Sequence, residues 1–496
     1  MRFLPAGGGS AATSRHLERF RMDNLPNLVL SIFGPAIFLG VTFIGIRMVS
    51  YWWSFAFRWN RYRPSRPVFT ADLIATDVPF IKIQITTRGS AGSTEVILRG
   101  VGTVMDLAQE APGFYASFLS IEVVTETAAQ YWPLKQAFED SVLPVDVLVV
   151  PEDYVPRDGT RLKARGLHYA VERRRAGWNL KPGQTFIVHY DEESVMVPAE
   201  LRKLIGCLAT TDKKVLEGPI YYPLDYMRSS RLCRAMEANR PIVCYECRHV
   251  METGTPFHLH GSNLVIDEEL ENEIGWDIGC LDGEPFIAED YVFGMKAFSK
   301  YGKDVFGWHG CVMLEQPPFS VRSAFRQRHR WVFGVLQGMA AMKVNPHFMM
   351  LPWRTRARLL WGTRYRLSTF ALGSLVGVLC MAVMPVFLVR SIQAMLLGGP
   401  PPTAAPEGVW LSAVGIMWIG SIFIGAWHNV ADSDLDATQK ITEIARAVLL
   451  APIAGLIESS AALQAVIDWA RGKRHVHWVP TPKTKEADLE SVRRSN

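Results

Sequence analysis

Two groups of polar residues near the middle of the chain have the types and spacing of a group-transfer site. Glu289 and Asp290 follow a short apolar run, and Gln327, Arg330 and Trp331 come about forty positions later. A carboxylate can act as general base on an alcohol, and a guanidinium can hold a diphosphate through two hydrogen bonds. A tryptophan face can carry a sugar ring. Together these groups predict sugar transfer from a nucleotide donor, although the carboxylate pair alone would also suit a helix N-terminus.

A third acidic group lies about a hundred positions upstream. Asp191, Glu192 and Glu193 directly follow the β-branched run over residues 186–189. Hard carboxylate oxygens suit Mg²⁺ or Mn²⁺, which would bridge the phosphates of the donor. Alone, such a group would more often cap a helix or form a solvated turn. The arginine group downstream leads us to favour a metal site.

An alternation of strands and helices is expected to position these groups. Strands are predicted at 80–85, 121–125, 145–150 and 186–189, and a helix at 94–107. This order predicts a parallel, doubly wound α/β sheet. Ligands of such sheets bind beyond the carboxyl ends of the strands. Acidic residues follow three of the predicted strands: Glu126, Glu152-Asp153, and Asp191 to Glu193.

Composition indicates a membrane protein rather than a nucleic-acid-binding one. The 496 residues are 49% hydrophobic with a mean hydropathy of +0.08, and the net charge is only +5. That charge gives no strong electrostatic case for nucleic acid. Arginines close to apolar segments instead favour contact with anionic membrane lipids. Seven scattered cysteines, an odd number, favour a reducing compartment without a disulfide framework.

The apolar runs predict a catalytic domain between membrane segments. Residues 25–46, 367–389 and 409–427 are long enough to span a hydrocarbon core. A carboxylate at the bilayer centre is costly, so Glu458 and Pro452 favour a broken, re-entrant or surface-lying helix over 447–467. The expected organisation is a mobile arm (1–24), a transmembrane helix with an interfacial segment (25–66), a cytoplasmic catalytic domain (67–345), an interfacial helix (346–366), transmembrane or re-entrant helices (367–470) and a basic cytoplasmic tail (471–496) in the cell (inner) membrane.

The paired motifs resemble membrane glycosyltransferase family 2, which includes the cellulose, chitin and hyaluronan synthases. Ala288-Glu289-Asp290 followed by Gln327-x-x-Arg330-Trp331 is similar to the acceptor-side signature of that family. With Met295-Lys296-Ala297 and the run Glu315 to Phe319, the likeness is closest to the egghead-type β-mannosyltransferases. The resemblance covers residues 78–345. It implies a GT-A fold, a Rossmann-like nucleotide-sugar-binding domain, inserted between transmembrane helices.

The resemblance also implies a role for each candidate residue. Asp290 would be the catalytic base, and Asp191 and Glu193 would hold the metal ion. The remaining candidates would contact the two substrates. Donor-binding residues would be Glu126, Lys163, Asp191, Gln327 and Arg330, and acceptor-binding residues would be Glu289, His260, Trp276 and Trp331.

Some residues depart from the family pattern or allow another interpretation. Glu126 stands where the family usually has aspartate, and His168 replaces an asparagine beside Lys163. Glu126 could instead lie at the edge of the core, and Lys163 on an exposed basic helix face. The pair Cys244 and Cys247, with His249, His258 and His260 nearby, leaves a zinc site open. The run Trp478 to Lys483 is similar to a gating tail of related synthases.

The sequence therefore predicts an integral-membrane, metal-dependent, inverting glycosyltransferase. Its expected donor is GDP-mannose, with a UDP-hexose as alternative, and its expected acceptor is a lipid-linked or membrane-held saccharide that gains a β-linkage. A processive polysaccharide synthase is a second interpretation, but few apolar segments follow the catalytic domain to build a pore. An inactive membrane scaffold with the same fold is a third, and the intact acidic and arginine groups argue against it.

Overall fold

The computed structural model of the protein describes residues 38–56, 78–90, 92–178, 183–253, 259–397 and 406–476. The chain divides into two compact units. One comprises Met1–Val49 with Val376–Met417, and the other comprises Ser50–Leu375 with Trp418–Asn496. The expected arm (1–24) and the gating-type run 478–483 lie outside the described residues, as does His258.

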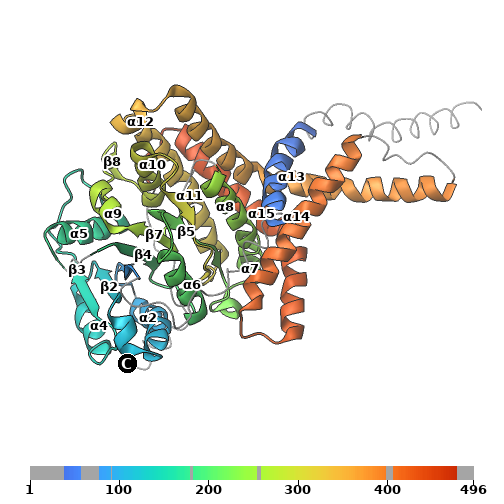
Figure 1. Cartoon of the computed structure of the whole chain (residues 1–496). Coiled ribbons are helices and arrows are strands. Elements are labelled where there is room, and N and C mark those ends of the chain that lie inside the picture. Colours follow the sequence, from blue (N-terminus) through green and yellow to red (C-terminus); the bar gives the residue numbers. More distant parts are fainter. Residues whose placement is uncertain are drawn as a thin grey trace, which may run out of the picture. The chain divides into compact units, whose positions relative to one another are not determined.

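A seven-stranded sheet forms the centre of the larger unit (Figure 1), in the order β10-β5-β7-β4-β1-β2-β3. Its strands are β1 (Phe80–Thr87), β2 (Leu119–Thr125), β3 (Val145–Val149), β4 (Thr185–Asp191), β5 (Val215–Glu217), β7 (Leu264–Asp267) and β10 (Phe306–Trp308). The four strands predicted from the sequence are confirmed as β1 to β4, which pair in parallel. The sheet is mixed rather than wholly parallel, because the short strand β7 runs antiparallel to both β4 and β5. The arrangement is GT-A-like.

The described residues also form helices and two small sheets. The helices are 38–56, α2 (Ser93–Gln109), α3 (Pro112–Ala116), α4 (Tyr131–Ala137), α5 (Lys163–Arg175), α6 (Pro198–Leu208), α7 (Arg231–Glu237), α8 (Arg240–Thr253), α9 (Glu268–Ile274), α10 (Glu289–Tyr301), α11 (Val321–Met342), α12 (Pro346–Met350), α13 (Trp353–Leu397), α14 (Pro406–Ala431) and α15 (Ala437–Ala470). Two 3₁₀ turns are η2 (Ala128–Gln130) and η3 (Tyr226–Arg228), and the small sheets pair β6 (Ile220–Tyr221) with β11 (Met313–Leu314) and β8 (Cys280–Leu281) with β9 (Glu284–Pro285).

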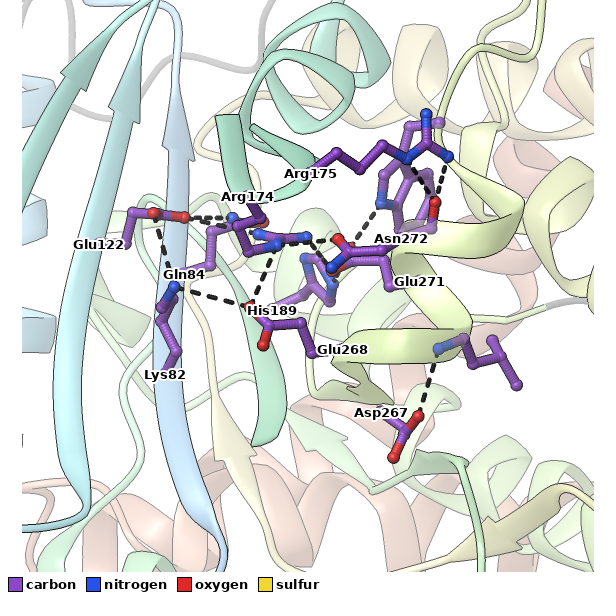
Figure 2. Close-up of polar contacts among 12 residues, drawn as sticks. Lys82, Gln84, Glu122, Arg174, Arg175, His189, Asp267, Glu268, Glu271 and Asn272 are labelled. Carbon is purple, nitrogen blue, oxygen red and sulfur yellow. Dashed lines mark hydrogen bonds and ion pairs between the residues drawn. The ribbon is translucent and has the colours of Figure 1, made fainter. Parts of the chain in front are cut away.

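The two faces of the sheet are both buried, but they differ in chemistry. Ile81, Ile83 and Ile85 of β1 pack into an apolar core with α2 and α6. The alternate residues Lys82 and Gln84 point to the other face, towards α5 and α9, and are also buried (Figure 2). The period-two alternation of β1 therefore marks an apolar face and a buried polar face, not a core face and a solvent face.

The polar face is closed by a network of buried charges that joins the sheet to α5 and α9 (Figure 2). Gln84 donates to Glu122 of β2 at 2.6 Å, and Lys82 lies 3.9 Å from Glu268 of α9. Arg174 of α5 pairs with Glu271 of α9 and lies 3.7 Å from Glu122. Because removing one member of such a network leaves a buried charge unpaired, it holds both helices firmly on the sheet.

Of the three forms predicted for the C-terminal apolar stretch, the structure contradicts the broken helix, while the re-entrant and surface-lying forms stay predictions. Helix α15 runs without interruption from Ala437 to Ala470 although it contains Pro452. Its buried carboxylate Glu458 pairs with Arg328 of α11 at 2.9 Å, and α11 and α15 pack side by side (Figure 1). The acidic residue that argued against a span is thus neutralised by a protein partner.

Two segments of the described chain are long and apolar enough to cross a membrane by length and composition, Ser412–Ala431 and Ala437–Ala470. The first overlaps the span predicted at 409–427. Helix α13 is continuous from Trp353 to Leu397, so the predicted boundary between an interfacial helix and a span at residue 366 does not appear as a break. In the smaller unit, the indole nitrogen of Trp410 donates to the Thr42 hydroxyl at 3.2 Å.

Candidate active site

The donor-side acidic residues lie at the carboxyl ends of β4 and β2, the two strands that flank β1. The hydroxyl of Thr87, at the end of β1, donates a hydrogen bond of 2.6 Å to Glu192, which follows β4. Glu126 follows β2, and its carboxylate lies 3.2 Å from Arg88 and 3.6 Å from Arg165. This edge is where ligands of doubly wound sheets bind. Glu126 therefore lies at this edge with two arginines beside it, and its contact with the donor stays a prediction.

Lys163, the first residue of α5, links this edge to the acceptor side. Its ammonium donates to Asp191 at the end of β4 and to the Gly261 carbonyl at 2.8 Å. Burial opposes the charge of Lys163, but the negative charges of Asp191, Glu289 and Asp290 outweigh it and raise the pKa of Lys163. This residue is thus a fixed cation among three carboxylates, not an exposed basic side chain.

Glu289 and Asp290 occupy the first turn of α10, where the helix dipole favours negative charge. A methyl group added at Gly261 would lie 3.3 Å from Lys163 Nζ, 3.5 Å from Asp290 Oδ2 and 3.9 Å from Glu289 Oε1. These three side chains therefore meet at one point beside the Gly261 backbone. Gly261 leaves open the space that a larger side chain would fill.

The environment of Asp290 suits a general base. Burial and the neighbouring Glu289 charge raise the pKa of Asp290 to about 7, against the Tyr291 amide and the cations Lys163 and His260. The Tyr291 amide donates to Asp290 at 2.7 Å and fixes the carboxylate. A base is most efficient when its pKa lies near the working pH. Burial likewise raises the pKa of Glu289.

Arg330 of α11 faces the same acidic group. Burial lowers the pKa of Arg330, while the charges of Glu289, Asp191 and Glu193 oppose that shift. Arginine stays protonated under any such shift at neutral pH. These interactions bring the predicted diphosphate-binding guanidinium near the predicted metal ligands and near Glu289, the neighbour of the predicted base.

Two glycines allow α11 to approach the start of α10 this closely. A Cβ at Gly334 would lie 2.9 Å from Ala288 Cβ and 3.0 Å from the Ala288 nitrogen. A Cβ at Gly338 would lie 2.5 Å from the ring of Tyr291. Backbone atoms cannot yield as a flexible side chain can, so the close approach of α11 to the start of α10 depends on these small residues.

The other two residues of the arginine motif, Gln327 and Trp331, both contact Arg328. Gln327 accepts a hydrogen bond from Arg328 at 2.6 Å. The Trp331 ring lies 4.5 Å from the guanidinium carbon of Arg240 and 4.6 Å from that of Arg328. These cation–π contacts orient the indole that the sequence analysis assigned to the acceptor.

Arg328 itself is a residue that sequence reasoning undervalued. It is fully buried and pairs with Glu237 of α7 and with Glu458 of α15. Burial opposes the charge of Arg328, but the two carboxylates raise its pKa. The available signal was the acidic residue inside an apolar stretch, Glu458, which requires a cationic partner.

Trp276 is not placed as predicted. Its side chain is 2% exposed, stacks on Phe293 with ring centroids 4.3 Å apart, and donates its N–H to Glu271 at 2.6 Å. The indole therefore belongs to the core beneath the polar face of the sheet. It has no free face for a sugar, so the acceptor-binding assignment is corrected to a packing one.

His260 lies next to the base, held by Glu217 at the end of β5. Its backbone N–H donates to Glu217, and its ring lies 3.7 Å from Cys247 Sγ. Burial alone would lower the pKa of His260. The charges of Glu217, Cys247 and Asp290 outweigh burial and raise the pKa of His260 to about 9. The imidazole therefore adds a positive charge close to Asp290, where sequence analysis placed the acceptor.

The candidate metal ligands, Asp191 and Glu193, lie at the end of β4. Nowhere in the part of the chain that the structure describes do three or more His, Cys, Asp or Glu side chains form a group that could hold a metal ion. This gives no support to a zinc site at Cys244 and Cys247. Mg²⁺, however, is usually bound by one or two carboxylates plus substrate phosphates. Asp191 and Glu193 are carboxylates of the kind that such a shared site uses, and metal binding by them stays a prediction.

Comparisons with known proteins agree with this arrangement. Residues 186–421 match the family described as Glycosyl transferase family group 2. The chain is similar to the β-1,4-mannosyltransferase egh of Drosophila melanogaster, with 28% identity over 262 residues, 52% of this chain and 52% of that protein. It is also similar to the β-1,4-mannosyltransferase bre-3 of Caenorhabditis elegans, with 24% identity over 407 residues, 82% of this chain and 79% of that protein.

Among solved structures, one match is a mannosyltransferase of Pyrobaculum calidifontis in complex with GDP-Man and Mn²⁺. It is 14% identical, covers 88% of this chain and 99% of its own, and superposes with a TM-score of 0.47. TarS of S. aureus in complex with UDP-GlcNAc is 12% identical, covers 79% of this chain and 92% of its own, and has a TM-score of 0.32.

Proposed function

We propose that this chain, of which residues 186–421 match Glycosyl transferase family group 2, transfers mannose from a nucleotide-sugar donor to a saccharide held at a membrane, forming a β-glycosidic bond with inversion. The preference for mannose rests on the two relatives, which are β-1,4-mannosyltransferases. The observation that carries the chemistry is the meeting of Asp290, Lys163 and Glu289 beside Gly261, with Asp191 bound to Lys163.

The proton of the acceptor hydroxyl goes to the carboxylate of Asp290. As that O–H bond breaks, the acceptor oxygen forms a bond to the anomeric carbon, and the bond from that carbon to the diphosphate oxygen breaks on the opposite side. The electron pair of the broken bond leaves with the diphosphate. General-base catalysis of this kind typically contributes about 10²–10⁴-fold. A pKa of Asp290 near 7 lets the carboxylate accept the proton at neutral pH.

The leaving diphosphate gains negative charge, and positioned cations stabilise it. Arg330 and Lys163 already interact with the carboxylates around the donor site. Pre-positioned charges of this kind are usually the largest single contribution to catalysis. Asp191 and Glu193 would hold a Mg²⁺ or Mn²⁺ ion, which when bound supplies positive charge to the donor phosphates.

Membrane association is the second part of the proposal, and the first turns of α13 support it. Trp353 and Trp361 are 67% and 68% exposed, and Arg354 and Arg358 are exposed beside them. Residues 346–397 contain no aspartate or glutamate. Tryptophan and arginine on one exposed helix face suit the headgroup region of an anionic bilayer.

Spin labelling of the reconstituted protein tests this placement. A nitroxide at Trp361→Cys should be more accessible to oxygen than to a water-soluble nickel chelate. The matched control is Trp132→Cys on α4, because Trp132 is equally exposed, at 75%. That label should favour the nickel chelate. Equal behaviour of the two labels would contradict the proposed membrane face.

Nucleotide release from a panel of donors tests the proposed reaction. Purified protein in lipid nanodiscs is incubated with GDP-mannose, UDP-glucose or UDP-N-acetylglucosamine, with and without Mn²⁺, and with a lipid-linked saccharide acceptor. The proposal predicts GDP release from GDP-mannose that requires both Mn²⁺ and acceptor, and a product lengthened by one or a few mannoses. Release from no donor would favour an inactive scaffold, and a ladder of long products would favour a processive synthase.

A further inference from the structure

A single buried carboxylate, Glu315, connects the two halves of the candidate active site. It directly follows β11 and is 7% exposed. Its Oε1 accepts a hydrogen bond from the Ser194 hydroxyl at 3.2 Å and another from the Ser262 hydroxyl. The two serines belong to different loops and lie 68 positions apart in the sequence. None of the three residues was a predicted site residue.

The first connection leads to the donor side. Ser194 closes the turn after β4, and its hydroxyl oxygen accepts from the Asp191 amide at 3.1 Å. The one hydroxyl proton of Ser194 is therefore used on Glu315, while its lone pair holds the Asp191 backbone. Next along the chain, Val195 pairs with Leu314 through backbone hydrogen bonds of 2.9 and 2.8 Å. The turn that carries Asp191 and Glu193 is thus tied to the Glu315 segment.

The second connection leads to the acceptor side. Ser262 is the residue after Gly261, whose carbonyl accepts from Lys163 at 2.8 Å and whose Cα faces Asp290. A shift of Ser262 would move the Gly261 carbonyl and with it the ammonium that bridges to Asp191. Glu315 therefore acts at a distance on the groups that surround the predicted base.

We propose that Glu315 is a positioning residue that fixes the Asp191 turn and the Gly261 loop relative to one another. A carboxylate oxygen has two lone pairs and can accept from both hydroxyls, so one side chain can hold both loops. The proposal rests on the proposed function, because it assigns the two loops to the donor and the acceptor. Loss of such a support typically costs about 10–100-fold in activity or metal affinity.

Steady-state kinetics of matched variants tests the proposal. Ser194→Ala should raise the KM for donor and Mn²⁺, and Ser262→Ala should raise the KM for acceptor, each with the other KM unchanged. Glu315→Ala should raise both and lower kcat/KM by about 10–100-fold. Glu315→Gln should be milder, because its amide oxygen can still accept both hydroxyls. Ser229→Ala is the control: it removes another buried hydroxyl, which donates to the Pro318 carbonyl at 2.6 Å in the segment after Glu315.

Non-additivity supplies a second criterion that simple destabilisation would not reproduce. Once Glu315 is alanine, the Ser194 hydroxyl has lost its acceptor, so adding Ser194→Ala should cause little further loss. Residues that share one hydrogen-bond network couple in this way, whereas independent ones add. Fully additive losses, or a Glu315→Ala variant that behaves like Ser229→Ala, would overturn the proposal.

Hydrogen exchange measured by mass spectrometry separates this proposal from the proposed function, because it needs no turnover. Glu315→Ala should accelerate exchange in both segments, 191–197 and 259–264. Ser194→Ala should affect only the first, Ser262→Ala only the second, and Ser229→Ala neither. A wild-type protein inactive with every donor would contradict the proposed function, while this exchange pattern would still support Glu315 as the link. Unchanged exchange in both segments of Glu315→Ala would refute it.

Discussion

Replacing Arg328 with methionine is expected to destabilise the larger unit by about 3 kcal/mol. Arg328 is fully buried and joins Glu237 of α7 to Glu458 of α15, with its Nε 2.9 Å from Glu458. Methionine has a similar volume but no charge, so the substitution removes the guanidinium that the two buried carboxylates share. The change in the free energy of unfolding therefore reports mainly the loss of the Arg328 charge and less the loss of side-chain packing.

The magnitude follows from what remains around the two carboxylates. Breaking a buried ion pair by removing one partner costs about 3–5 kcal/mol. Arg240 still lies 3.5 Å from Glu237 and 3.6 Å from Glu458, which offsets part of that cost. We therefore expect the lower end of the range. Glu458→Gln should cost less, because Arg328 then keeps Glu237.

Urea unfolding of the detergent-solubilised protein, followed by tryptophan fluorescence, gives these free energies of unfolding. Arg446→Met is the matched control, because it removes an arginine of α15 whose side chain is 41% exposed and which pairs with Glu443 at 2.5 Å. Pairs with an exposed cation are worth about 0–1 kcal/mol, and the buried Glu443 keeps Arg234 as its partner at 2.9 Å. If Arg328→Met lost no more stability than Arg446→Met, the reasoning from the buried network would be refuted.

Three further predictions concern the site and its supports. Gly334→Ala should lower kcat by forcing α11 away from Ala288, a strain of about 1–3 kcal/mol, and unchanged kcat would show that this approach is not needed. Trp276→Ala should cost about 3–5 kcal/mol of stability as a core truncation yet leave the acceptor KM of the remaining folded protein unchanged; a raised KM would restore the acceptor assignment. The pKa of Asp290 is raised to about 7, and the ionised form is the base, so kcat/KM should rise with pH through about 7. A profile that is flat between pH 5 and pH 8 would contradict this.

The central part of the fold could be predicted from sequence because its signals are local. Strands β1 to β4 are β-branched runs, and acidic residues mark where they end. The antiparallel strand β7 could not be predicted in the same way, because four buried residues, Leu264–Asp267, carry no periodicity that distinguishes direction. Direction is decided by the pairing partners β4 and β5.

The site residues show the same division between local and distant causes. Asp290 and Arg330 have roles that the residue types imply, and the structure brings both to one acidic group. Trp276 was misassigned because an indole suits a core as well as a sugar, and only its packing on Phe293 decides. Glu458 argued for a broken helix because its partner Arg328 lies 130 positions away.

The most direct test of the account is the Asp290→Asn variant, assayed on one preparation for mannosyl transfer and for binding of GDP with Mn²⁺ by calorimetry. Asp282→Asn is the control, because the Asp282 side chain is 67% exposed. The account predicts that Asp290→Asn loses transfer by at least about 10²-fold while GDP binds as tightly as to the wild type and the control stays fully active. Full turnover by Asp290→Asn, or a loss of GDP binding equal to the loss of transfer, would contradict the assignment of Asp290 as the base.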